Sequence, residues 1–111
     1  MATGKIRMVI NPPDVVNKTR TTLTSGVITP ITSAGGWYSV EAQTRETSGE
    51  CQAYLGDQSL TTYYAAIDSG TGTFKRACTP WIYFPKGATF SARCFFTASD
   101  RSGLNFAEPL D

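Results

Sequence analysis

The feature that most constrains this fold is a two-residue alternation of apolar side chains. Tyr38, Val40 and Ala42 alternate with Trp37, Ser39, Glu41 and Gln43, and the same alternation returns between residues 90 and 97. Successive side chains of a β-strand point to opposite faces, so this period predicts strands with one buried face. No helical stripe of apolar residues interrupts the pattern. The sequence therefore predicts an all-β fold.

Turn-forming residues separate the alternating segments at intervals of about 8–12 residues, which is typical of β-sandwiches. The strongest turn is Asp68-Ser69-Gly70-Thr71-Gly72, and Pro85-Lys86-Gly87 is a second. These turns predict one antiparallel β-sandwich of jelly-roll-like type. The expected strands cover residues 20–24, 27–33, 37–44, 50–55, 60–67, 73–78, 81–84, 88–97 and 104–106.

The N-terminal residues 1–13 are expected to form an extended arm ahead of a sandwich domain of residues 14–111. Ile6, Met8 and Ile10 alternate with Lys5, Arg7 and Val9 and predict a short strand. Pro12 and Pro13 end it, because proline has no N–H to donate to a β-ladder. The chain shows neither the apolar run of a signal peptide nor a stretch long enough to span a membrane, so we expect no membrane partner.

The charge pattern argues against binding to nucleic acid. The 111-residue chain has ten Lys and Arg residues and nine Asp and Glu residues, and the basic residues are scattered along the sequence. A nucleic-acid-binding protein would instead gather positive charge into a stripe that follows phosphates. Charged residues make up 17% of the chain, below the usual value of about 25%. A polar but weakly charged surface suits contacts with other proteins.

The chain has no histidine, which removes the common nucleophile–histidine systems and the common histidine metal sites. Paired carboxylates are then the remaining route to catalysis, and Glu41 and Glu50 could face each other across a hairpin. We favour the interpretation that the acidic residues lie on polar surfaces, some paired with Arg45 or Lys75. The sequence thus predicts no enzyme, catalytic residue, metal or cofactor. The carboxylates considered are Glu41, Glu46, Glu50, Asp57 and Asp68.

The cysteines are three in number and widely spaced, at Cys51, Cys78 and Cys94. This spacing is not that of a disulfide framework or a zinc site. We expect buried thiols that pack as small apolar residues. A Cys51–Cys94 pair across the sandwich is the alternative.

Aromatic residues are more numerous than one small core can hide, with two Trp, five Tyr and six Phe. Rings on the outer side of a sheet mark a subunit interface, a sugar-stacking platform, or a face covered by the chain's own loops. We favour the interface. The interface candidates, with the apolar residues of the arm, are Ile6, Met8, Ile10, Trp37, Tyr54, Tyr63, Trp81 and Phe95.

Two segments carry a family resemblance: Gly35-Gly36-Trp37-Tyr38-Ser39-Val40-Glu41-Ala42 and Phe84-Pro85-Lys86-Gly87-Ala88-Thr89-Phe90. Over residues 27–98 the chain resembles small β-sandwich proteins of tailed-bacteriophage particles. The resemblance implies a virion protein, either a capsid decoration (cement) protein or a tail-fibre head, and such proteins are commonly trimers. The implied partner is the major capsid protein or another virion protein. The shared positions are structural turns, so no functional residue is carried over.

Three functions follow as expectations. The first is a non-enzymatic decoration protein that binds and stabilises the assembled shell, with the arm reaching a neighbour and Lys5 and Arg7 meeting an acidic surface. The second is a tail-fibre or baseplate module that binds host glycans through Trp37, Trp81 and neighbouring tyrosines. The third, and least favoured, is a small carboxylate hydrolase.

Overall fold

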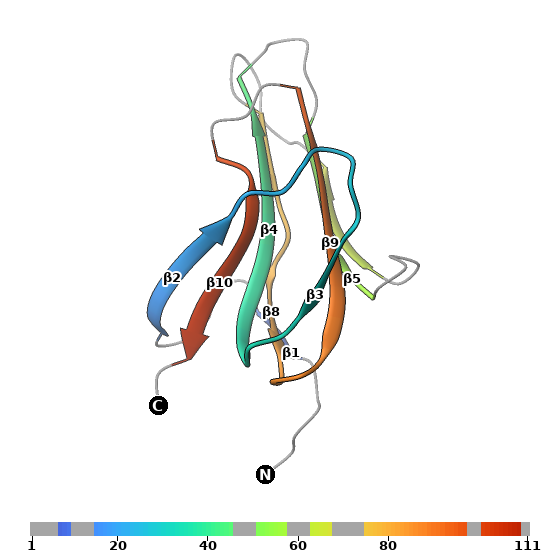
Figure 1. The fold of residues 1–111 in the computed structure, drawn as a ribbon. Coiled ribbons are helices and arrows are strands. Elements are labelled where there is room, and N and C mark those ends of the chain that lie inside the picture. The colour runs from blue at the N-terminus through green and yellow to red at the C-terminus, as the bar shows by residue number, and fades with distance from the viewer. Residues whose placement is uncertain are drawn as a thin grey trace.

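The computed structural model describes residues 7–9, 15–45, 51–57, 63–67, 75–97 and 101–109, and these form two packed antiparallel β-sheets (Figure 1). The all-β sandwich predicted from the alternation is confirmed. No described residue is helical, so this part of the chain has no helix that could cross a membrane. The strands are β1 (Arg7–Val9), β2 (Val15–Thr21), β3 (Thr29–Thr32), β4 (Gly36–Thr44), β5 (Cys51–Gly56), β6 (Tyr63–Ile67), β7 (Lys75–Cys78), β8 (Trp81–Phe84), β9 (Thr89–Phe96) and β10 (Gly103–Pro109).

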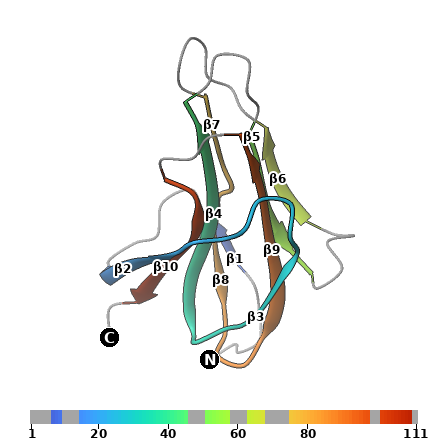
Figure 2. The same ribbon diagram turned by 45° about the horizontal axis from the view of Figure 1, so that its top comes forward.

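Sheet A has the order β1-β8-β4-β10-β2, and β7 pairs with β4 beside β8. Sheet B has the order β3-β9-β5-β6. The pairing is nested: β2 pairs with β10, β3 with β9, β4 with β7 and β8, and β5 with β6. The two views in Figures 1 and 2 show β3, β9, β5 and β6 as one layer and β2, β10, β4 and β8 as the other. Distant segments of the sequence therefore meet on the faces of both sheets.

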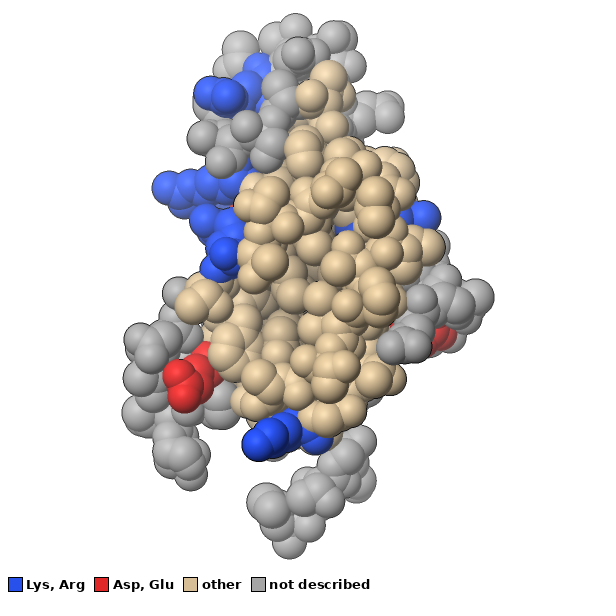
Figure 3. Space-filling view, in the orientation of Figure 1, with Lys and Arg blue, Asp and Glu red and all other residues tan. Residues whose placement is uncertain are grey.

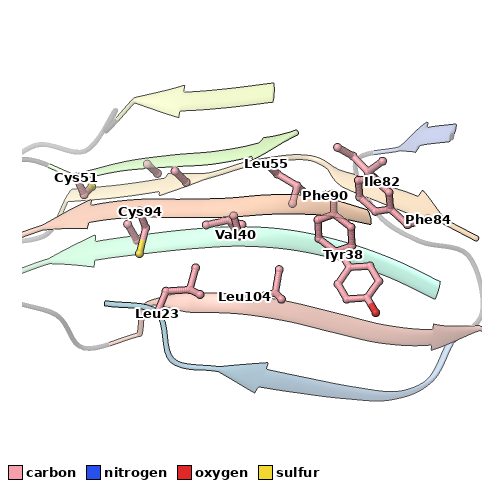
Figure 4. Packing of buried hydrophobic residues seen from close by; sticks show 14 residues of the cluster. Leu23, Tyr38, Val40, Cys51, Leu55, Ile82, Phe84, Phe90, Cys94 and Leu104 are labelled. Carbon is pink, nitrogen blue, oxygen red and sulfur yellow. The ribbon is translucent and has the colours of Figure 1, made fainter. Parts of the chain in front are cut away.

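The core lies between the sheets and contains the alternating residues that the sequence places inward (Figure 4). Phe90 is fully buried and stacks on Phe84, with ring centroids 4.0 Å apart. Tyr38 packs against Phe90 at 4.8 Å, and its hydroxyl accepts a hydrogen bond of 2.9 Å from the Ala34 N–H. That bond satisfies the polar end of a ring whose body is buried. The smaller core residues at the other end of the sandwich include Cys51 and Cys94.

Several strand boundaries differ from the sequence-based expectation. The polar strand expected at 20–24 is β2, which ends at Thr21 because its partner β10 begins at Gly103. Leu23 leaves the ladder and is buried in the core. The segment 27–33 contains the edge strand β3, and Pro30 is tolerated there because one side of an edge strand needs no donor.

The N-terminal segment contributes a strand to the chain's own sheet. In β1, Met8 pairs with Ile82 of β8. Arg7–Val9 thus belongs to the edge of sheet A, which differs from an arm that extends to a neighbour. Ile6, Ile10 and the predicted turn at 68–72 lie outside the described residues.

Candidate functional site

The outer face of β4 is buried although it points away from the core. Trp37, Ser39 and Glu41 have relative exposures of 6%, 1% and 2%. They lie on the opposite side of the strand from Tyr38, Val40 and Ala42, as the alternation predicts. Arg20 of β2, Arg76 of β7 and Asn105 of β10 cover the two polar residues, Ser39 and Glu41. This face therefore holds a polar cluster that is shielded from solvent yet separate from the core.

Glu41 is the centre of that cluster and accepts hydrogen bonds on both carboxylate oxygens. The Arg20 guanidinium donates to Oε1 from Nη2 at 2.7 Å and from Nε at 3.1 Å. The Asn105 amide donates to the same oxygen at 3.2 Å, and Arg76 Nη2 donates to Oε2 at 3.1 Å. Charge-assisted bonds of this kind are the stronger class in proteins. Glu41 thus fixes two guanidinium groups beside one another.

The register of three strands explains why these residues meet. Ser39 of β4 lies opposite Asn105 of β10, which lies opposite Arg20 of β2. Asn105 bridges the row, because its amide donates to Ser39 Oγ at 3.2 Å and its Oδ1 accepts from Arg20 Nε at 3.1 Å. The expectation that Glu41 is a surface residue on a polar face is wrong, because its side chain is only 3% exposed. The covering groups come from strands distant in sequence, while Glu50 lies outside the described residues.

The two tryptophans of this face have different surroundings. Trp37 packs edge-on against Tyr83 of β8, with ring centroids 5.4 Å apart, and is buried. The expectation that Trp37 presents an outward ring is therefore wrong in part: it faces outward from the sheet, but neighbouring strands cover it. Trp81 is half-buried and reaches the cleft described next.

An open cleft of about 370 Å³ lies over the cluster on sheet A. Its lining contains one carboxylate, Glu41, among the described residues, whereas glycoside hydrolysis needs two. The part of the chain that the structure describes also has no cluster of three or more metal-ligating side chains. The arrangement can bind a polar ligand. The lining residues that carry this argument are Arg20, Ser39, Glu41, Arg76, Trp81 and Asn105.

The outer face of sheet B carries two of the predicted interface rings. Tyr54 of β5 and Phe95 of β9 contact each other edge-on at 6.1 Å, and both are half-buried. The Arg93 guanidinium lies over both rings, 4.8 Å and 5.0 Å from their centroids, at cation–π distance. Tyr63 of β6 pairs with Gly56 of β5 in the same sheet. The structure describes the backbone of Tyr63 and of Met8 but not their side chains.

A pair of exposed aliphatic residues lies in the connection before β3, the strand that pairs with β9. Val27 and Ile28 keep 48% and 41% of their surface in solvent. They follow Gly26, whose N–H donates to the Cys94 carbonyl at 2.8 Å, and a Cβ atom at Gly26 would lie 3.6 Å from the Phe95 ring. We call Val27, Ile28, Tyr54 and Phe95 the apolar patch. It joins the connection between β2 and β3 to the outer face of sheet B.

The sequence missed several residues of both surfaces for identifiable reasons. Arg20, Arg76 and Asn105 come together only through strand pairing, and no local pattern links them. Val27 and Ile28 carry a local signal, because two aliphatic residues directly after a Ser-Gly turn are rarely hidden in a short loop. Exposure of these two residues was therefore within reach of sequence reasoning.

The cysteines are free thiols in the structure. Cys51 and Cys94 are buried on neighbouring strands of sheet B, where Cys51 pairs with Phe96 and Cys94 with Ala53. The alternative of a pair across the two sheets is therefore wrong, because both residues belong to one sheet. Burial raises the pKa of the Cys94 thiol to about 11.

Cys78 differs from the other two thiols, because it is exposed and lines the cleft. Desolvation raises its pKa; Glu41 adds to the rise, and the Arg76 guanidinium opposes it. We expect a thiol reagent to modify Cys78 alone in the native protein, at a rate that climbs as the pH rises toward that pKa, since the thiolate is the nucleophile. Thiol titration with and without denaturant measures this. Modification of Cys51 or Cys94 in the native protein would contradict the burial pattern. So would a Cys78→Ser variant whose native form reacts with the reagent as much as the wild type does.

No protein-family model matches the sequence, and comparisons with curated proteins and with solved structures found no match.

Proposed function

We propose that this chain is a non-enzymatic structural protein of a tailed-bacteriophage particle, a capsid decoration protein that binds the assembled shell and stabilises it. The observation that carries the proposal is the apolar patch. Exposed aliphatic residues beside half-buried aromatic rings are the composition of protein interfaces, where Tyr and Arg often dominate the binding energy. Arg93, whose guanidinium lies over the rings of Tyr54 and Phe95, supplies that pairing here.

The surroundings of the patch support the same proposal. In Figure 3 the centre of the described surface carries uncharged side chains, with charged side chains at its margins, and the β2–β3 connection crosses this side of the molecule in Figure 1. Desolvation of an uncharged surface costs little free energy, because no charged group has to leave water. A decoration protein needs such a surface, since its effect comes from binding the assembled state and not the dissociated one.

The strand order adds a fold-level analogy. Nested pairing of β2 with β10, β3 with β9, β4 with β7 and β8, and β5 with β6 is compatible with the jelly-roll-like type that the sequence predicts. Viral capsid proteins and lectins both use that fold. Fold alone does not establish function, but the analogy agrees with the resemblance to virion proteins, from which the proposal also takes a trimeric state.

Removal of the protein from the particle tests the proposal. We expect particles that lack this chain to lose infectivity at a lower temperature than normal particles, and added purified protein to restore the difference. Bound protein stabilises the shell by about 2.7 kcal/mol per site when its free concentration is a hundredfold above the dissociation constant. Particles that resist heating equally well with and without the chain would overturn the decoration function.

The second candidate function is glycan binding by a tail-fibre or baseplate module, and the cleft on sheet A favours it. A half-exposed tryptophan beside carboxylate, amide and guanidinium groups provides an apolar wall and fixed polar partners, the usual composition of a ligand site. In this version Trp81 makes the contact, because Trp37 is covered by Tyr83.

A further inference from the structure

Arg93 of β9 carries a positive charge that no acidic side chain of the described residues neutralises. Its guanidinium lies over the rings of Tyr54 and Phe95, 4.8 Å and 5.0 Å from their centroids. Among the described residues, no hydrogen bond or ion pair joins Arg93 to another side chain. Arg20 and Arg76 differ, because both pair with the carboxylate of Glu41 on sheet A. The donors of Arg93 are therefore available to a partner.

The packing of Arg93 fixes which end of its guanidinium a partner can reach. Tyr54 lies directly opposite Arg93 in the β5–β9 ladder, so the ring and the cation share the outer face of sheet B. The Nε atom is buried, and among the described residues it is the one buried side-chain nitrogen or oxygen without a hydrogen-bond partner. The residue as a whole is half-buried. Its two terminal nitrogens thus keep their contact with solvent and form the accessible end of the fork.

The apolar patch surrounds this cation. Tyr54 and Phe95 lie under the guanidinium, and Ile28 directly precedes Thr29, which pairs with the neighbour of Arg93, Ala92. A protein that covers the patch therefore takes the guanidinium out of water as well. Burial of a charge is costly unless the charge is paired and hydrogen-bonded. A surface that covers the patch tightly must then supply the missing anion.

We infer that the apolar patch binds a segment of the shell protein that places the carboxylate of an Asp or Glu on Arg93. The carboxylate accepts hydrogen bonds from both terminal nitrogens, because the planar guanidinium fork matches its two oxygens. The rings of Tyr54 and Phe95 already hold the guanidinium, so little side-chain freedom is lost on binding. Val27 and Ile28 contact apolar neighbours of the acidic residue. The inference rests on the proposed function and names the chemistry of its partner.

The test is co-sedimentation with shells prepared without this chain, in two batches. One batch is untreated, and the other is amidated at its exposed carboxylates with a carbodiimide and glycinamide and checked for intact particles by electron microscopy. We expect the wild-type chain to bind untreated shells about tenfold or more tightly than amidated shells, and the difference to shrink as salt is added. Arg93→Met should bind both batches with the same weak affinity, because it has no charge for the carboxylate to meet.

Two further variants serve as controls. Arg45→Met changes the net charge equally, but Arg45 is exposed at the end of β4 in sheet A, so this variant should bind both batches like the wild type. Arg93→Lys keeps the charge without the planar fork and should bind with an affinity between those of the wild type and Arg93→Met. Arg93→Met should unfold within about 5 °C of the wild type, since the lost ring contacts are offset by the loss of an unpaired buried N–H.

The outcomes distinguish this inference from the proposed function. Shell binding that Arg93→Met leaves unchanged, or that amidation weakens equally for Arg93→Met and the wild type, would overturn the carboxylate on Arg93 while shell binding stands. A wild-type chain that binds no shells would overturn both. Analytical ultracentrifugation of the free chain tests the other occupant, a second copy. Self-association that Arg93→Met abolishes would overturn the inference, because a second copy would then cover the patch.

Discussion

Phe90→Ala is expected to lower the free energy of unfolding by about 3–5 kcal/mol, the range for removing a buried ring from a core. Phe90 is fully buried, stacks on Phe84 at 4.0 Å and packs against Tyr38 at 4.8 Å. Because Phe84 and Tyr38 belong to sheet A and Phe90 to sheet B, the cavity would open where the sheets contact each other (Figure 4). Chemical denaturation followed by tryptophan fluorescence measures the loss.

Phe95→Ala is the matched control for that experiment. Phe95 lies on the same strand, but it points to the outer face of sheet B and is half-buried. Its removal should cost clearly less, about 1–2 kcal/mol, because less area returns to water. A Phe90→Ala protein that is as stable as Phe95→Ala would contradict the assignment of inner and outer faces.

Gly103→Ala is expected to destabilise the protein by about 3 kcal/mol or more, through overpacking and backbone strain together. Gly103 has φ +149°, which side-chain-bearing residues rarely adopt, and a Cβ atom there would overlap the Thr21 carbonyl oxygen. The clash is with backbone, so no side-chain rotation relieves it. The C-terminal end of β2 would have to move away from β10. Thermal unfolding by circular dichroism measures the effect.

Gly87→Ala separates the clash from the backbone strain. Gly87 also has a positive φ, +90°, but a Cβ atom there would meet nothing within 4 Å. We therefore expect a loss of about 1 kcal/mol from strain alone. Similar losses in the two variants would show that the close approach of Gly103 to Thr21 is not as the structure has it.

The parts of the fold that the sequence predicted are those set by local chemistry. A period of two identified the inner faces of β4 and β9, because strand geometry fixes which neighbours share a face. Pro30 marked an edge strand because the proline ring removes a donor. The Pro85–Gly87 turn was found for a similar reason, since the Gly87 conformation suits glycine.

The rest depended on strand pairing, which no local pattern encodes. Glu41 was expected on a solvated face, yet Arg20 and Arg76 cover it, and these lie 21 and 35 residues away in sequence. Trp37 was expected to project outward, but register places Tyr83 beside it. An outward position on a strand therefore predicts the direction of a side chain, while its exposure depends on which long side chains the neighbouring strands bring.

Sedimentation with shells prepared without this chain tests our proposal that the apolar patch binds another protein surface. We expect the wild-type protein to co-sediment with such shells. Val27→Ser combined with Ile28→Ser should weaken binding about tenfold or more, since two exposed aliphatic groups would no longer be buried. Thr24→Ser, in the same connection and also exposed, should bind like the wild type. Equal binding of the Val27/Ile28 double variant and the wild type would contradict the account.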